Sequence, residues 1–389
     1  MKLKASTSVV LLIVASVIFF SQSCKKESGG DPPPGGGGST GGNPTLPSTP
    51  YNYAGALDNM PAYYKGILTN HPEFDNTPAN NPITNDGATL GRVLFYDKAL
   101  SANNTISCGS CHHQDKAFVD GLQFSKGFEG GNTRRNSMSL LNIRFFGFKK
   151  MFWDLRAATL EDQVLMPIQD HIEMGMPSLT ALVNKLTAKS YYPSLFQKAF
   201  GSETITSDKI SKALAQFIRS IVSYNSKFDV GIANNFSNFT AQETFGMGRV
   251  KATCGECHND VATFGDHVPT FFFNSTPNNI TNNGLDEVYT DNGFGEVTGV
   301  PEYMGFFKVP SLRNIELTAP YMHDGRFTTL EQVVSHYQSG VKDHPNLPIQ
   351  LAPGGIGFPD SEKEAMIAFL KTLTDKSVTT DIKYSDPFK

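Results

Sequence analysis

The sequence contains little that would indicate a membrane-spanning, nucleic-acid-binding or disordered protein. Lys and Arg number 33 against 37 Asp and Glu, so the formal net charge is −4, whereas nucleic-acid-binding proteins usually carry a positive charge. The apolar run at residues 9–20 is shorter than the roughly 20 residues that span a bilayer. Hydrophobic residues fill 39% of the 389 positions, which suffices for about two globular domains. No nucleic-acid partner is expected.

Cysteine is scarce as well, and the spacing of the five cysteines is informative. Four of them form two Cys-x-x-Cys-His motifs, made of Cys108, Cys111 and His112 and of Cys254, Cys257 and His258. In such a motif two thiols bond to the vinyl groups of one porphyrin, and the adjacent imidazole ligates its iron. A thioredoxin-like pair needs no following histidine, and a zinc site would leave both histidines unused. The sequence therefore predicts two covalently bound haem c groups, with His112 and His258 on their irons.

The N-terminus has the features of an export signal. Lys2 and Lys4 precede the apolar run, and small residues lead to Cys24, the remaining cysteine. We interpret residues 1–23 as a signal peptide and Cys24 as a lipidation site, with an ordinary signal peptide and an incidental cysteine as the alternative. Residues 24–50 are rich in Gly and Pro and are expected to form a flexible linker. The protein should face the periplasm as an exported lipoprotein that meets the membrane only through its N-terminal lipid.

The remaining sequence has mainly helical periodicity. Apolar residues recur at helical spacing over residues 207–229, residues 240–251 read as a helix entering the second motif, and Ser361 and Glu364 form a capping box for a helix ending near residue 373. Strand-like alternation is rare. We expect a mainly α fold of two tandem cytochrome c-type haem domains, with long loops and little β structure. The predicted domains are residues 51–224 and 225–375, with a tail at 376–389 that could pack back on the first domain.

Around the two motifs, residues 85–375 carry a series of further landmarks. They are LGRVLFYD at 90–97, RN at 135–136, LN at 141–142, MFWDLR at 151–156, IEM at 172–174, FKVPSLRN at 307–314 and PYMHDG at 320–325. In this order and spacing the sequence resembles the bacterial diheme cytochrome c peroxidases and the related methylamine-utilisation diheme enzymes. The resemblance implies that the first haem is the peroxidatic site and that the second receives electrons from a donor.

The resemblance also implies roles for four further residues. Glu173 would be the distal acid/base that moves a proton between the two oxygens of hydrogen peroxide. Gln163 would hydrogen-bond the bound oxygens, and Pro167 would shape the pocket. Trp153, the single tryptophan of the chain, would relay electrons between the two haems.

The sequence departs from typical peroxidases of this family at the distal side of the first haem. Where those enzymes carry a histidine that blocks the iron, in a segment like Ser-x-Gly-His, this chain reads Ser125-Lys126-Gly127-Phe128. Phenylalanine cannot ligate iron, so the first haem is expected to be open in the fully oxidised protein. His171 is the remaining nearby candidate for a ligand.

A second departure concerns the distal ligand of the second haem, which is a methionine in typical members. Tyr337 stands where the methylamine-utilisation enzymes use a tyrosine ligand, and His336 and Met322 are its rivals. A phenolate is a hard anionic donor that lowers the reduction potential, whereas a thioether raises it. His323 is expected to hydrogen-bond a haem propionate, and Asn136 matches the side chain that holds a calcium ion in the family.

Three functions are compatible with these features. The leading hypothesis is an enzyme, a cytochrome c peroxidase that reduces hydrogen peroxide to water with electrons from a small cytochrome c or similar redox protein. The second is an enzyme that oxidises side chains of a partner protein by long-range electron transfer. The third is a diheme electron carrier or redox sensor, against which Glu173 and Gln163 argue because a carrier has no use for a proton-transfer group above an open iron.

Overall fold

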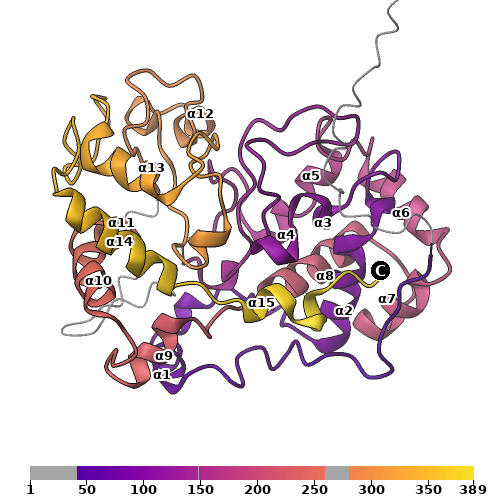
Figure 1. The fold of residues 1–389 in the computed structure, drawn as a ribbon. Helices are drawn as coiled ribbons and strands as arrows, with labels where there is room; N and C mark the ends of the chain where they lie inside the picture. The colour runs from indigo at the N-terminus through magenta and orange to yellow at the C-terminus, as the bar shows by residue number, and fades with distance from the viewer. Residues whose placement is uncertain (1–41, 148, 259–279) are drawn as a thin grey trace, which may run out of the picture. The chain divides into compact units, whose positions relative to one another are not determined.

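The computed structural model describes residues 42–147, 149–258 and 280–389, so Cys24 and the signal peptide lie outside the described residues. The fold is mainly helical, which confirms the expected class (Figure 1). Within the described ranges, β structure beyond isolated bridges is limited to one antiparallel pair, β1 (Ile280–Thr281) and β2 (Phe307–Lys308). The α-helices of these ranges are α1 (Ala62–Asn70), α2 (Asn85–Tyr96), α3 (Cys108–Cys111), α4 (Leu160–Gln163), α5 (Met166–Gln169), α6 (Leu179–Thr187), α7 (Tyr192–Phe200), α8 (Ser207–Arg219), α9 (Lys227–Ala233), α10 (Ala241–Thr253), α11 (Gly255–His258), α12 (Phe294–Thr298), α13 (Leu330–Ser335), α14 (Asp360–Thr372) and α15 (Ser377–Thr380).

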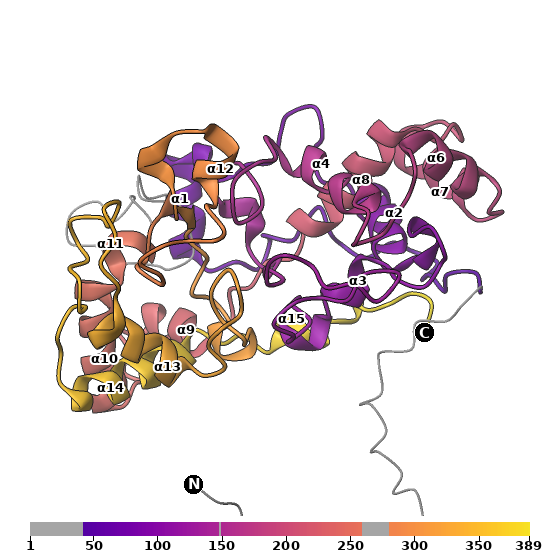
Figure 2. The same cartoon turned by 90° about the horizontal axis from the view of Figure 1, so that it is seen from above.

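The first hydrophobic core forms where α2 packs against α8, side by side in both views (Figures 1 and 2). Gly91 allows the close crossing, because a Cβ at this position would come within 2.0 Å of the Ala213 carbonyl oxygen. Leu90, Leu94 and Phe217 are fully buried at this contact region. The apolar stripe predicted within residues 207–229, which runs from Ile210 to Ile221, is therefore core.

The second hydrophobic core repeats this arrangement with α10 and α14, which also lie together in both views. Here Gly246 allows the crossing, since a Cβ would come within 1.9 Å of the Ala365 carbonyl oxygen. Phe369 is fully buried in this core, and α13 packs on α14 beside it. In each half, the helix that precedes a Cys-x-x-Cys-His motif thus uses a glycine to approach a later helix.

Two of the helix predictions need correction. The helix expected over residues 207–229 ends at Arg219, and α9 begins only at Lys227. The backbone amides of Ser223 and Tyr224 instead donate to Asn142 Oδ1 at 2.7 Å and to Asp375 Oδ2 at 3.0 Å. The predicted capping box of the last long helix is also wrong, because α14 begins at Asp360, directly after a proline, and its N-cap makes no side-chain hydrogen bond.

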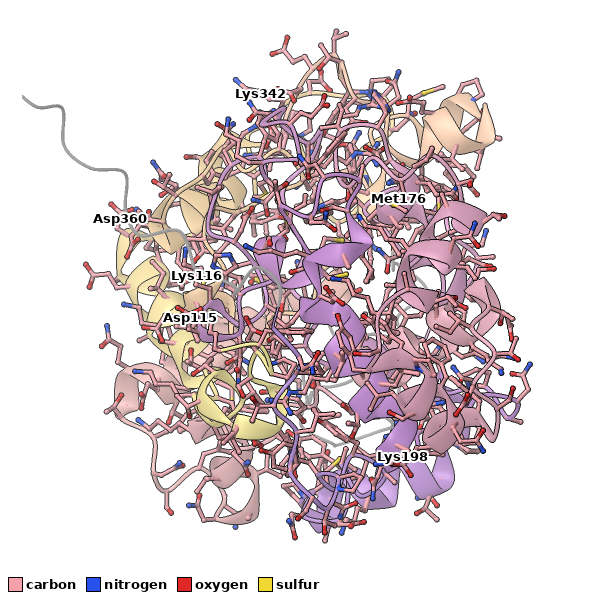
Figure 3. The ribbon with its side chains drawn as sticks, turned by 90° about the vertical axis from the view of Figure 1, so that its right-hand side faces the viewer. Asp115, Lys116, Met176, Lys198, Lys342 and Asp360 are labelled. Atoms are coloured by element: carbon pink, nitrogen blue, oxygen red, sulfur yellow. The ribbon has the colours of Figure 1, made fainter. Side chains whose placement is uncertain are left out.

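The C-terminal tail lies against the first core. Val378 and Tyr384 are members of that core, and Tyr384 Oη donates to the Ser220 carbonyl oxygen at 2.6 Å. Gln114 Nε2 donates to the carbonyl oxygens of Val378 and Asp381 at 3.0 and 2.8 Å. Asp115 and Lys116 belong to the same short 3₁₀ turn, which contacts α15 (Figure 3). Residues 378–384 therefore complete a core built mainly from the first half of the sequence.

In the part of the chain that the structure describes, no helix combines the length and the apolar character needed to cross a bilayer.

Candidate haem sites

Both motif histidines present the same ring nitrogen for a metal. His112 Nδ1 lies 2.8 Å from the Phe118 carbonyl oxygen, and His258 Nδ1 lies 2.9 Å from the Pro310 carbonyl oxygen. A carbonyl oxygen can only accept, so Nδ1 carries the proton and Nε2 keeps its lone pair for iron. Burial lowers the pKa of both rings, which favours the neutral ligating form.

The motif cysteines are positioned by short helices. The α3 turn holds Cys108 and Cys111 and begins with a Ser107 and Ser110 capping box, while Cys254 ends α10 and Cys257 lies in α11. All four are free thiols rather than disulfides. Two thiols on one helical turn beside an imidazole with a free Nε2 are the donor set that haem c requires. The residues present therefore fit a covalently bound haem at each motif.

The second motif opens into a cavity of about 220 Å³. Cys254, Cys257 and His258 line it, together with two of the three candidate distal ligands, Tyr337 and Met322. His336 is not among its lining residues, and its Nε2 lies 2.8 Å from the Asn283 carbonyl oxygen. Tyr337 and His336 both belong to a π-helical segment, His336–Gly340, a rare geometry that is frequent at functional sites. Of the three candidates, His336 is thus the one whose ligating atom is already hydrogen-bonded to the main chain.

His323 also lines this cavity. It is 5% exposed and stacks on the Phe307 ring, with centroids 3.7 Å apart. Burial lowers the pKa of His323 to about 4, against the opposing charges of Asp324 and Asp291. The ring is thus held neutral at the wall of the cavity that the second motif lines.

Glu173 interacts electrostatically with the first attachment site. Its carboxylate contributes to raising the pKa of both Cys108 and Cys111 to about 12, although burial of the two thiols is the larger cause. Burial, aided by Asp170 and opposed by Arg156, raises the pKa of Glu173 itself to about 7. A carboxyl group that titrates near neutrality can both take and return a proton.

The loop that carries Glu173 is fixed through its backbone. Asp170 Oδ1 accepts hydrogen bonds from the amides of Ile172 and Glu173 at 2.8 and 2.9 Å. The Phe128 amide donates to the Glu173 carbonyl oxygen at 3.0 Å, and the Phe128 ring lies against Gly175, where a Cβ would come within 2.3 Å of the ring. The residue that replaces the distal histidine of typical peroxidases is thus joined directly to the Glu173 loop.

Gln163 and Pro167 lie on neighbouring short helices, α4 and α5, and both are half-buried. The Met176 amide, three residues after Glu173, donates to the Ile168 carbonyl oxygen of α5 at 2.9 Å (Met176 is labelled in Figure 3). The backbone thereby connects α5 to the Glu173 loop. His171 is exposed.

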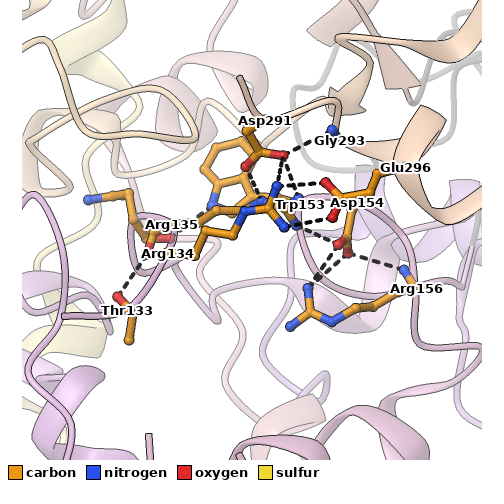
Figure 4. Close-up of polar contacts among 10 residues, drawn as sticks. Thr133, Arg134, Arg135, Trp153, Asp154, Arg156, Asp291, Gly293 and Glu296 are labelled. Atoms are coloured by element: carbon orange, nitrogen blue, oxygen red, sulfur yellow. Dashed lines mark hydrogen bonds and ion pairs between the residues drawn. The ribbon is translucent and has the colours of Figure 1, made fainter. Parts of the chain in front are cut away.

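Trp153 is buried at the centre of an ionic network that joins two distant segments of the chain (Figure 4). Its Nε1 donates to the Asn136 carbonyl oxygen at 2.8 Å, and the Asn136 amide donates to the His323 carbonyl oxygen at 2.8 Å. Arg135 binds Asp154 at 2.5 Å and Asp291 at 2.7 Å. Burial opposes a charge on Asp291, but Arg135 and a backbone amide outweigh it and lower the pKa of Asp291 to about 2. Trp153 also lines the cavity of the second motif.

Asn136 directs its side-chain Nδ2 to the Leu122 carbonyl oxygen at 2.8 Å. Among the described residues, no cluster of three or more His, Cys, Asp or Glu side chains could hold a metal ion. A calcium site built from one amide, carbonyl oxygens and water would not form such a cluster.

Sequence reasoning missed two residues of the second site. Lys308 is 6% exposed, lines the cavity, and donates its backbone amide to the Trp153 carbonyl oxygen at 2.7 Å. Its position next to the apolar Phe307 and Val309 was the available signal. Asn283 lines the same cavity from the loop after β1, where nothing in the local pattern indicates a site.

Comparisons with known proteins agree with this geometry. Residues 85–236 match the family model described as Di-haem cytochrome c peroxidase. The chain is 34% identical over 308 residues to the Methylamine utilization protein MauG of Methylorubrum extorquens, which covers 78% of this chain and 82% of the relative. It is 34% identical over 315 residues to the Cytochrome c551 peroxidase of Nitrosomonas europaea, covering 79% and 86%.

Among solved structures, a MauG-like protein associated with microbial copper homeostasis superposes with a TM-score of 0.68 at 34% sequence identity, covering 80% of this chain and 96% of that one. The relatives include both MauG proteins and peroxidases. The chain belongs to the di-haem cytochrome c peroxidase and MauG family, and it is an oxidoreductase with two haem c groups.

Proposed function

We propose that the protein reduces hydrogen peroxide to water with electrons from a small cytochrome c or similar redox protein. The observation that carries this proposal is Glu173, a carboxyl group with a pKa of about 7 that interacts electrostatically with both thiols of the first motif and lies on a loop held by Phe128. A proton-transfer group at that point serves peroxide chemistry and has no use in a simple electron carrier.

When bound, the two haems supply the iron that binds peroxide and the path for two electrons. The reaction consumes one peroxide, two electrons and two protons and yields two water molecules. Glu173 takes the proton from the oxygen nearer the first motif and returns it to the oxygen that leaves. Gln163 donates a hydrogen bond to these oxygens, Pro167 shapes the pocket, and Phe128 occupies the place of a blocking ligand. Trp153 relays electrons from the second site.

At the second site, we propose Tyr337 as the distal ligand and His323 as a partner of a haem propionate. Both line the cavity, which supports these roles. A calcium ion at Asn136, a signal peptide at residues 1–23, lipidation of Cys24, and a periplasm-facing location remain predictions. The same holds for the division into residues 51–224, 225–375 and 376–389.

Substitution of Glu173 tests the proposal. Glu173→Gln keeps the size and polarity of the side chain but cannot move a proton, so peroxide turnover should fall by roughly 10² to 10⁴ while both haems stay bound. Glu129→Gln is the matched control, because it makes the same substitution at an exposed glutamate on the neighbouring loop, next to Phe128. Turnover should be measured by stopped flow at equal haem content. Equal rates for both variants and the parent protein would remove Glu173 from the reaction.

A second candidate function is oxidation of side chains on a partner protein. Phe128 and the cavity position of Tyr337 favour it, since these are the two departures from typical peroxidases. The two functions differ in which reductant returns the peroxide-oxidised protein to its starting state. For a peroxidase, a small reduced cytochrome would accelerate this return. For an enzyme that oxidises a partner protein, only that partner would accelerate it.

A further inference from the structure

Asn283 is hydrogen-bonded to two of the three candidate ligands of the second haem and lines the cavity together with the third, Tyr337. Its side-chain Nδ2 donates to Met322 Sδ at 3.4 Å, and its main-chain carbonyl oxygen accepts from His336 Nε2 at 2.8 Å. Tyr337 lines the same cavity as Asn283; burial raises the pKa of its phenol, and the Asn283 side chain opposes that rise.

Each contact has a distinct consequence. The bond to the main chain holds His336 Nε2 away from the cavity, so the commonest haem ligand among the three is already engaged. The bond from Nδ2 occupies a lone pair of the Met322 sulfur. Tyr337 is left as the cavity-lining candidate whose oxygen gains charge when it binds a metal, and an amide N–H stabilises that charge.

The orientation of the Asn283 amide agrees with a donor role. Its Oδ1 is buried and has no hydrogen-bond partner among the described residues. An amide turned the other way would direct an acceptor at the sulfur and the phenol. The side chain therefore presents its N–H groups to the ligands, at the cost of an unsatisfied carbonyl oxygen.

We propose that Asn283 is a positioning residue of the second haem, whose side-chain N–H donates to the Tyr337 oxygen when that oxygen ligates the iron, and whose carbonyl holds His336 aside. This inference rests on the proposed ligation by Tyr337. Hydrogen-bond donation to a phenolate withdraws electron density from it, so Asn283 raises the reduction potential of the second haem above that of an unbonded tyrosinate site.

The test uses the holoprotein with both haems attached. Asn283→Leu removes the polar atoms of the side-chain amide at similar size. Asn283→Asp keeps the shape but replaces the donor with an acceptor, and it serves as the test if the leucine variant fails to fold. Both should shift the low-spin EPR signal of the oxidised protein and lower the midpoint potential of the second haem. The signal of the first haem should not change. Asn234→Leu, at an exposed position after α9, is the matched control and should leave both haems unaltered.

Tyr337→Phe separates this inference from the ligand assignment. Should Tyr337→Phe abolish the low-spin signal while both Asn283 variants retain the parent spectrum and potential, the role of Asn283 is overturned and the ligand stands. Should Tyr337→Phe leave the signal intact, the ligand assignment fails, and the role of Asn283 fails with it.

Discussion

Glu173 sits where burial and Asp170 both disfavour a negative charge, and its pKa is about 7. Only the ionised form can take the first proton from peroxide, so kcat/KM should rise with pH through about 7 and fall on the acid side. Asp170→Asn removes the neighbouring charge and keeps an oxygen for the amides of Ile172 and Glu173. The pKa of Glu173 should then fall, and the acid limb should move to lower pH.

The measurement is a pH–rate profile of peroxide reduction at constant ionic strength. Asp162→Asn, on the exposed side of α4, serves as the control and should leave the limb in place. An unchanged limb in Asp170→Asn would assign the acid pKa to another group.

Phe128 gives a second prediction at this scale. Without a ligand from this position, the oxidised protein should show a high-spin ferric signal and react with peroxide without prior reduction. Phe128→His places an imidazole beside the Glu173 loop, where the Phe128 amide already meets the Glu173 carbonyl oxygen. This variant should convert the first haem to low spin and delay peroxide reactivity until one electron has been added.

EPR of the oxidised protein and stopped-flow mixing with peroxide test this prediction. Leu122→His, at an exposed position of the same loop region, controls for a histidine that cannot reach the iron. Two low-spin haems in the unaltered protein would contradict the open site and would point to another ligand such as His171.

At the scale of elements, two glycines of helix α10 give opposite predictions for protein stability. Gly246→Ala forces a Cβ against the Ala365 carbonyl oxygen and should destabilise the protein by about 1 to 3 kcal/mol. Gly248→Ala, on the same helix α10, meets nothing within 4 Å and should stabilise it by about 0.5 to 1 kcal/mol. Thermal unfolding of the two holoproteins provides the comparison, and equal Tm values would show that the α10 and α14 contact adapts without strain.

Elements whose determinants are local were predictable from sequence, and those set by distant partners were not. The α10 helix follows from Thr240 and Glu243, which form a capping box within four residues. The break after α8 depends instead on Asn142 and Asp375, which accept the amides of residues 223–225 from 81 and about 150 positions away. A local apolar stripe continues through Ile221 and therefore suggests a longer helix than the chain forms.

The same distinction applies to the haem sites. Attachment cysteines and proximal histidines are adjacent in sequence, so the motifs identify them directly. The distal face of the second site combines Tyr337 with Asn283, which is 54 positions earlier and has no signal of its own. Lys308 lies in an apolar segment, and only the fold shows that this residue lines the cavity.

For the whole molecule, the central prediction is the stoichiometry of two haems per chain. Protein produced with a cytochrome c maturation system should gain the mass of two covalently attached haems. A variant with Cys108→Ala and Cys111→Ala should gain the mass of one, because the second motif lies in a separate core. Intact mass spectrometry measures this, and a parent protein with one haem or none would contradict the two-haem architecture.

The C-terminal tail has a consequence for the order in which the molecule can be completed. Val378 and Tyr384 belong to the core of the first half, yet they are synthesised after every residue of the second core. The second core needs nothing beyond Leu373, so its set of residues is complete before that of the first core. A nascent chain therefore completes its second core before its first, and a chain cut before Val378 would leave the core beside the first haem motif without these two side chains.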